Sequence, residues 1–215
     1  MTQRNLVLAA AVLLLSIFFA AALFYQHQQV QEATRLAHQH SAHLLRADAP
    51  RLGADHPAVV IVEFFDPACG ACQGFYEPVK HLLNEHPGKI RLVLRWAPFQ
   101  VGSEQIVALL EAANLQGKLW PVLDILMETQ DAWKPQREVV PELAWKQLDG
   151  LGLDLERLRR DLADPEVIRR LALDVEATDR LKIDTTPTFF VNGQPLPGFG
   201  FGVLKKAVEV ALLIP

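Results

Sequence analysis

Residues 59–72 are the stretch that most constrains what this chain can fold into. An apolar, β-branched run leads through Asp66 and Pro67 to a pair of cysteines, Cys69 and Cys72. The run predicts a buried strand, and the cysteines stand where a helix should begin. A thiol at a helix N-terminus faces unpaired backbone N–H groups and the positive end of the helix dipole, which favour its thiolate. We therefore predict Cys69 as a nucleophile and Cys72, one turn further along, as its resolving partner.

Length and composition limit the classes of protein that the chain can belong to. The 215 residues are 50% hydrophobic, carry a net charge of −4 and include only two cysteines. This suffices for one well-packed domain, and the acidic balance indicates no nucleic-acid partner. Two cysteines exclude a disulfide framework and a four-cysteine zinc site. The pair is thus either the reactive part of the protein or a structural crosslink, and a two-residue loop gives a crosslink little stabilising effect.

Residues 6–25 form an apolar run that only Ser16 interrupts. At a helical rise of about 1.5 Å per residue the run spans about 30 Å, the thickness of a bilayer core, and the apolar region of a signal peptide is usually shorter. The positive-inside rule places Arg4 in the cytoplasm and the following chain outside. We predict that residues 1–25 anchor the chain in lipid, as a single pass through the inner membrane with the rest on the periplasmic or extracytoplasmic side. The alternative is a signal peptide cleaved near residues 20–22, which would release the protein into the periplasm.

Residues 26–49 are polar and rich in Gln, His and Ala, and we interpret them as a helical stalk. Their apolar positions repeat in a weak heptad pattern. A metal site is the alternative interpretation of the four histidines His27, His38, His40 and His43. Only the last two would share a helix face, and no cysteine is near them, so we predict no metal here.

From residue 56 onward the pattern predicts a strand, a helix and a second strand. The strands cover residues 58–65 and 90–96, and the helix covers residues 69–84, with Pro78 breaking or kinking it. A β-α-β unit with a right-handed crossover has parallel strands. Cys69 then lies at the carboxyl end of a strand, where open α/β sheets hold their sites.

Glu63 interrupts the first apolar strand. A buried carboxyl group has a raised pKa and needs a hydrogen-bond partner. Glu63 is therefore a candidate proton acceptor beneath the cysteines. The alternative is that it points to solvent at the edge of a strand, and the spacing does not separate the two.

The rest of the chain is predicted to be a helical block followed by a short return to β structure. Residues 103–182 read as successive helices, an insertion or lid on a smaller sheet domain. A strand at residues 189–191, a hairpin turn at residues 192–193 and a closing helix at residues 201–213 follow.

Several of these features together resemble a known family. They are Glu-Phe-Phe-Asp at residues 63–66, the pair Cys69 and Cys72, the helical block, and Thr-Pro-Thr at residues 186–188 before the hairpin. The combination is similar to the DsbA-like branch of the thiol–disulfide oxidoreductases, over residues 50–213. The resemblance implies an α/β thioredoxin fold: a central mixed sheet flanked by helices, with an all-helical subdomain inserted at about 103–182 in a domain of residues 50–215.

The resemblance also implies a role for each matching residue. Cys69 is the exposed nucleophile and Cys72 the buried resolving thiol. Pro187 is the cis-proline facing the pair, and Thr186 presents backbone groups to an extended substrate segment. Glu63 is the buried acid that relays protons for the second thiol.

The dipeptide between the cysteines departs from the family. DsbA-type oxidases hold Pro-His there, whereas this chain has Gly70 and Ala71, which carry no donor and no charge. We expect these two residues to tune the redox pair, with backbone N–H groups and the helix dipole alone stabilising the thiolate. A less stabilised thiolate makes the disulfide a weaker oxidant, so we expect a reduction potential below that of a strong oxidase.

These features together predict an enzyme that exchanges disulfides with exported client proteins, without a cofactor. The partners are proteins with thiols or disulfides and a redox partner in the membrane. One alternative is a dedicated membrane-tethered reductase for the maturation of cytochromes or metal sites. Others, from different classes, are a copper-binding chaperone that uses the two thiolates, and a binding module that only keeps the fold.

Overall fold

The computed structural model describes residues 43–213. The predicted anchor and all but the end of the predicted stalk lie outside the described residues. Within residues 43–213, no helix is both long and apolar enough to cross a membrane.

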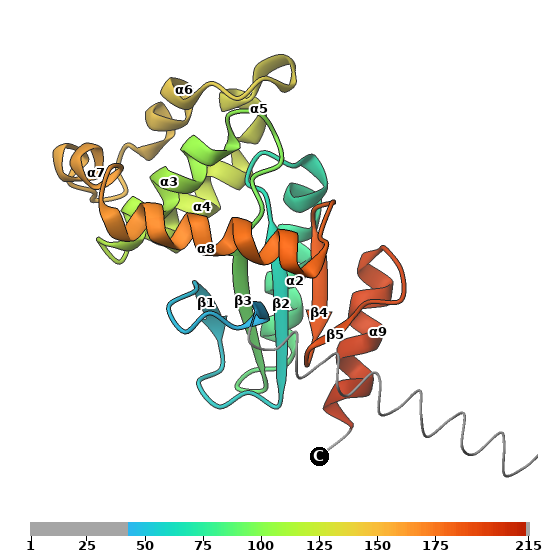
Figure 1. Cartoon of the computed structure of the whole chain (residues 1–215). Helices are drawn as coiled ribbons and strands as arrows, with labels where there is room; N and C mark the ends of the chain where they lie inside the picture. The colour runs from blue at the N-terminus through green and yellow to red at the C-terminus, as the bar shows by residue number, and fades with distance from the viewer. Residues whose placement is uncertain (1–42, 214–215) are drawn as a thin grey trace, which may run out of the picture. The chain divides into compact units, whose positions relative to one another are not determined.

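A parallel β-α-β unit forms the centre of the sheet, as the sequence predicts (Figure 1). Strand β2 (Val59–Phe65) leads into helix α2 (Gly70–Glu85), and the chain returns along strand β3 (Ile90–Trp96). The two strands pair over their full length, from Val59 beside Ile90 to Phe65 beside Trp96. The carboxyl end of β2 therefore delivers the chain directly to the start of α2.

Three shorter strands extend the sheet to the order β1-β3-β2-β4-β5. Strand β4 (Thr188–Val191) runs antiparallel to β2, and β5 (Gln194–Pro195) pairs with it through the predicted hairpin. Strand β1 (Arg51–Gly53) pairs antiparallel with β3 and was not predicted, because three residues carry no periodic pattern. The result is the predicted mixed sheet flanked by helices.

The two faces of β2 pack against different layers, which follows from the period of two along a strand. Val59, Ile61 and Phe65 face the larger core, to which α2 and α9 (Phe201–Leu212) also contribute. Val62 and Phe64 face a smaller core that includes part of helix α8. Because both faces are covered, nearly every residue of β2 is buried.

Helix α2 continues through Pro78, so the proline does not break the helix, which was one of its two predicted effects. Its buried side chains lie on both sides of the proline, including Tyr76 before it and Val79 and Leu82 after it. Packing of this one apolar face against the sheet stabilises the helix on both sides of the proline, even though the proline removes one backbone hydrogen bond.

Helices fill the chain between β3 and β4, above and across the sheet in Figure 1. Helix α8, drawn in orange, crosses the face opposite to α2. Two of these helices begin at an aspartate whose side chain accepts a backbone N–H of the first turn, Asp154 for α7 and Asp164 for α8. The helical elements are α3 (Ser103–Asn114), α4 (Leu119–Glu128), α5 (Gln130–Trp133), η1 (Pro135–Arg137), α6 (Pro141–Trp145), η2 (Lys146–Leu148), α7 (Leu155–Asp161) and α8 (Pro165–Leu181).

A buried ionic cluster attaches α8 to the sheet and to the segment before β1 that contains Arg46. The carboxylate of Asp174 on α8 is fully buried. It accepts Arg95 Nε of β3 at 2.5 Å, Arg46 Nε at 3.1 Å and the Trp96 backbone N–H at 3.1 Å. Glu111 on α3, also buried, accepts Trp96 Nε1 at 2.6 Å. The cluster thus connects α8, β3, α3 and the segment that contains Arg46.

Candidate active site

Cys69 and Cys72 lie at the start of α2, just after the end of β2. Cys69 is the N-cap of α2, with extended backbone angles (φ −83°, ψ 124°), and is half-buried. Cys72 lies in the first turn and is fully buried. Both are free thiols. The unpaired N–H groups of the first helical turn therefore surround the Cys69 sulfur.

The loop before β4 approaches Cys69 from a distant part of the sequence. The peptide bond between Thr186 and Pro187 is cis. The Cys69 sulfur lies 3.3 Å from the Thr186 carbonyl oxygen, to which it donates when protonated, although the two residues are 117 positions apart in the sequence. Strand β4 pairs directly with β2, which brings this loop beside the start of α2.

The two thiols have opposite ionisation properties. The pKa of Cys69 is lowered to about 5, chiefly by hydrogen bonding from the Cys72 thiol, with further contributions from Thr186 and from the backbone N–H groups of Cys72 and Ala71. Burial raises the pKa of Cys72, and its hydrogen bond to Cys69 and the charge of Glu63 raise it further. At neutral pH Cys69 is therefore a thiolate, while Cys72 keeps its proton.

The dipeptide contributes only its backbone to this effect. Gly70 and Ala71 are both exposed, and neither side chain reaches the sulfur with a donor. Groups other than the backbone also lower the pKa of Cys69, since the Cys72 thiol contributes most and Thr186 contributes as well. Sequence spacing could not reveal the contact with Thr186, which becomes a neighbour of Cys69 only in the folded chain.

Glu63 is buried beneath the pair, so the interpretation of it as a solvent-exposed edge residue is wrong. Its side chain is 1% exposed and lies on the same face of β2 as Ile61 and Phe65, the face that α2 covers. Its Oε1 atom has no hydrogen-bond partner among the described residues. Burial, together with the charge of Cys69, raises the pKa of Glu63 well above the usual range.

Replacing Glu63 with leucine should stabilise the reduced protein. A buried polar group without a partner costs about 1–3 kcal/mol, and leucine removes it. The gain should be larger at pH 8 than at pH 4. The pKa of Glu63 is higher in the folded than in the unfolded chain, so above the unfolded pKa only the unfolded chain ionises. The free energy of unfolding of the wild type therefore falls as pH rises, and the leucine variant does not lose this stability. Urea unfolding of both proteins at the two pH values measures this, and an equal or negative gain at pH 8 would contradict it.

The active-site loop is held by residues that the sequence did not single out. The buried carboxylate of Asp66 accepts the backbone N–H of Ala68 and of Gln100, each at 2.8 Å, and the hydroxyl of Ser103. Burial raises the pKa of Asp66, and these hydrogen bonds oppose the rise. An Asp-Pro pair just before a helix is a signal for such a turn. On the other side of the loop lies Gln130, for which the sequence offers no signal.

A small apolar cavity lies next to the cis-proline. It has a volume of about 180 Å³ and is lined by residues that include Pro187, Phe189 and Phe199. The Phe199 side chain is 70% exposed and its ring packs 5.3 Å from that of Phe75 on α2. The half-buried Cys69 and an apolar surface thus share one end of the sheet.

The residues that the structure describes contain no group of three or more His, Cys, Asp or Glu side chains placed to hold a metal. Of the four histidines considered for a metal site in the stalk, only His43 lies within the described residues.

A thiolate at a helix N-terminus, a buried second thiol three residues further on and a neighbouring cis-proline loop are the parts of a thiol–disulfide oxidoreductase. Comparison with known proteins agrees with this class. The family model described as thioredoxin matches residues 45–198. The chain therefore belongs to the thioredoxin family, and its mixed sheet with flanking helices is a thioredoxin fold.

Three individual proteins show how the similarity is distributed. A thioredoxin-like oxidoreductase from Silicibacter pomeroyi is 30% identical, with a TM-score of 0.68 over 79% of this chain and 95% of that one. The Probable disulfide bond formation protein D of Bacillus anthracis is 27% identical over 75% of this chain and 77% of its own length. The Na(+)/H(+) antiporter NhaA 3 of Salinispora tropica is 34% identical over 74% of this chain. This chain spans only 24% of that antiporter.

Proposed function

We propose that the protein exchanges disulfides with exported client proteins through Cys69 and Cys72. The observation that carries the proposal is the placement of the two thiols, with Cys69 half-buried at the N-cap of α2 and Cys72 fully buried in the first turn. This placement lowers the pKa of Cys69 and raises that of Cys72. One sulfur is a nucleophile and a good leaving group at neutral pH, and the other stays protonated until it is needed.

In the oxidising direction, a client thiolate attacks the Cys69 sulfur of the Cys69–Cys72 disulfide. The S–S bond breaks, Cys72 leaves as a thiolate and takes up a proton, and the client is held to Cys69 by a mixed disulfide. A second client thiolate attacks the client sulfur of that bond, and Cys69 leaves as a thiolate. The client loses two electrons and two protons, and the pair gains both electrons. In the reducing direction the same steps run backwards, and the proton of Cys72 passes to the ionised form of Glu63, which is the minor form because the pKa of this buried carboxyl group is raised.

The surface around Cys69 suits an extended client segment. The Thr186 carbonyl, at 3.3 Å from the sulfur, is a backbone acceptor beside the point of attack. The apolar cavity lined by Pro187 and Phe199 lies on the same loop and offers a place for an apolar client side chain. Backbone hydrogen bonds with one apolar pocket recognise unfolded segments without requiring a particular sequence.

We further propose that the domain acts at a membrane, held there by residues 6–25. The length and apolarity of that segment support the proposal. A region similar to this chain occurs within a protein named as a Na(+)/H(+) antiporter. An anchored domain would meet a membrane redox partner without diffusing to it, and a location outside the cytoplasm would allow the reactive disulfide to persist.

The reduction potential of the pair decides the direction of exchange. A thiol pKa of about 5 lies between the values of about 7 for thioredoxin and about 3.5 for DsbA. We therefore expect a potential between those of the same two proteins, about −270 mV and about −120 mV. Equilibration of the full-length chain with glutathione buffers, followed by alkylation and mass measurement, gives the value.

A potential from about −180 to −120 mV would support disulfide donation or shuffling. A value near or below about −270 mV would instead support the membrane-tethered reductase, which needs its own source of electrons. A pair that exchanges no disulfide with glutathione at any ratio would contradict the proposed function altogether.

A further inference from the structure

Two side chains of the helical block bind three consecutive carbonyl groups of the active-site loop. Gln130 Nε2 donates to the carbonyl oxygen of Pro67 at 2.8 Å and to that of Cys69 at 3.3 Å. The Lys134 ammonium donates to the carbonyl oxygen of Ala68, between them. Every carbonyl from residue 67 to residue 69 therefore has a side-chain donor from a segment more than 60 residues away in the sequence.

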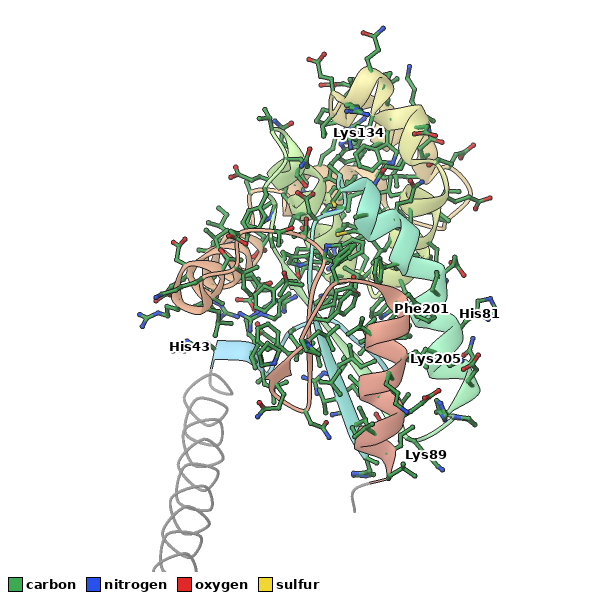
Figure 2. The ribbon with its side chains drawn as sticks, turned by 90° about the vertical axis from the view of Figure 1, so that its right-hand side faces the viewer. His43, His81, Lys89, Lys134, Phe201 and Lys205 are labelled. Atoms are coloured by element: carbon green, nitrogen blue, oxygen red, sulfur yellow. The ribbon has the colours of Figure 1, made fainter. Side chains whose placement is uncertain are left out.

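The two donors act together because of their spacing. Gln130 begins helix α5 and Lys134 follows its last residue, so they are four residues apart and lie on the same side of one helical turn. Gln130 is 3% exposed, and its uncharged amide can be buried because it is hydrogen-bonded to these carbonyl groups. Lys134 is only half-buried. In Figure 2 it lies at the end of the domain where α2 begins, while Lys89 and Lys205 lie toward the other end.

The positive charge of Lys134 is close to Cys69 and is not cancelled locally. The Ala68 carbonyl carbon is bonded to the Cys69 nitrogen, so an ammonium on that oxygen lies within about 5 Å of the Cys69 backbone. Among the residues that the structure describes, no carboxylate forms an ion pair with Lys134. The Lys134 ammonium is thus placed to favour a negative charge on Cys69.

We propose that Lys134 is a positioning residue for disulfide exchange, which holds the Ala68 carbonyl and supplies beside Cys69 the positive charge that the dipeptide Gly70-Ala71 lacks. The inference rests on the proposed function, since it concerns the same thiol. It assigns to the helical block a part in setting the redox properties of the pair. Because the charge stabilises the thiolate, it stabilises the reduced form and makes the disulfide more oxidising.

Substitution of Lys134 tests the charge separately from the fold. In the full-length chain, K134Q should raise the pKa of Cys69 by about 0.5–1, a reduced version of the usual effect of a nearby charge because the ammonium is half-exposed. The equilibrium constant with glutathione should shift threefold to tenfold toward the disulfide, where tenfold corresponds to about 30 mV. K134R should keep wild-type values. The matched control K118Q removes another half-buried lysine of the helical block, next to Gly152, and should change neither quantity.

The pKa of Cys69 is read from the pH dependence of its alkylation by iodoacetamide, and the equilibrium constant from the glutathione titration. Chemical modification of the folded proteins gives the same comparison if K134Q does not fold. Acetylation is carried out on the oxidised proteins, in which the Cys69–Cys72 disulfide protects both sulfurs, and removes the charge of every lysine. After reduction it should raise the Cys69 pKa in the wild type but much less in K134R, whose guanidinium is not acetylated.

Two results would overturn the proposal: unchanged pKa and potential in folded K134Q, or equal effects of acetylation on the wild type and K134R. Failure of the proposed function is a different outcome. In that case neither protein would oxidise or reduce a client, although the pKa of Cys69 would still respond to Lys134.

Discussion

Replacing Cys69 with serine should abolish disulfide exchange by the full-length chain. The serine hydroxyl does not ionise near neutral pH and forms no disulfide, so both the nucleophile and the electron acceptor are lost. We expect the rate of oxidation of a reduced peptide, or of reduction of insulin, to fall by at least about 10³-fold, as for removal of a nucleophile in other enzymes. The chain has no third cysteine that could substitute.

Cys72→Ser is the matched control, because it removes the second thiol and leaves the first. Cys69 should still attack a client disulfide, but the resulting mixed disulfide has no resolving thiol. A covalent complex with the client should therefore accumulate on a non-reducing gel and disappear with dithiothreitol. Full biological activity of the Cys69→Ser protein would show instead that the chain is a binding module that only keeps the fold.

Replacing Asp174 with alanine should cost about 3–5 kcal/mol of the free energy of unfolding, the usual penalty for breaking a buried ion pair from one side. The substitution leaves the Arg95 guanidinium, which is 3% exposed, without its carboxylate. It also removes the acceptor for Arg46 and for the Trp96 backbone N–H. Urea unfolding of the reduced proteins measures the difference.

Glu176→Ala is the control on the same helix. Glu176 pairs with Arg180, but both side chains are more than half-exposed, so the loss should be below about 1 kcal/mol. Asp174 packs on the face of the sheet opposite to α2, and the pKa of Cys69 should therefore not change in either protein. An Asp174→Ala protein within about 1 kcal/mol of wild type would show that water reaches the cluster and replaces the lost contacts.

Local patterns in the sequence were enough to predict most of the central sheet. The β-α-β unit is confirmed because a continuous apolar strand and an amphipathic helix are each recognisable within one short window. Strand β1 was missed because it has three residues and owes its pairing to β3. The break at Pro78 was wrongly predicted because packing of α2 on the sheet outweighs the local effect of a proline.

Some residues of the candidate site could be predicted from local sequence patterns, and others could not. The two cysteines, their place at a helix start and the Thr-Pro pair are readable along the chain. The burial of Glu63 was left open, because period-two alternation shows which face a residue shares but not what covers that face. The role of Gln130 and Lys134 could not be predicted, since no local sequence pattern indicates that their side chains bind the carbonyl groups of residues 67–69.

By itself, the sequence determined where the thiols lie on the backbone, because a strand, a turn and a helix N-terminus depend on neighbouring residues. The tertiary structure decided how those thiols ionise. It buried Cys72 and Glu63, and it brought Thr186 to 3.3 Å from the Cys69 sulfur across 117 residues. It also placed Lys134 on the loop. The physical reason is that a pKa depends on burial, charge and hydrogen bonds in space, and only the folded chain brings these groups together.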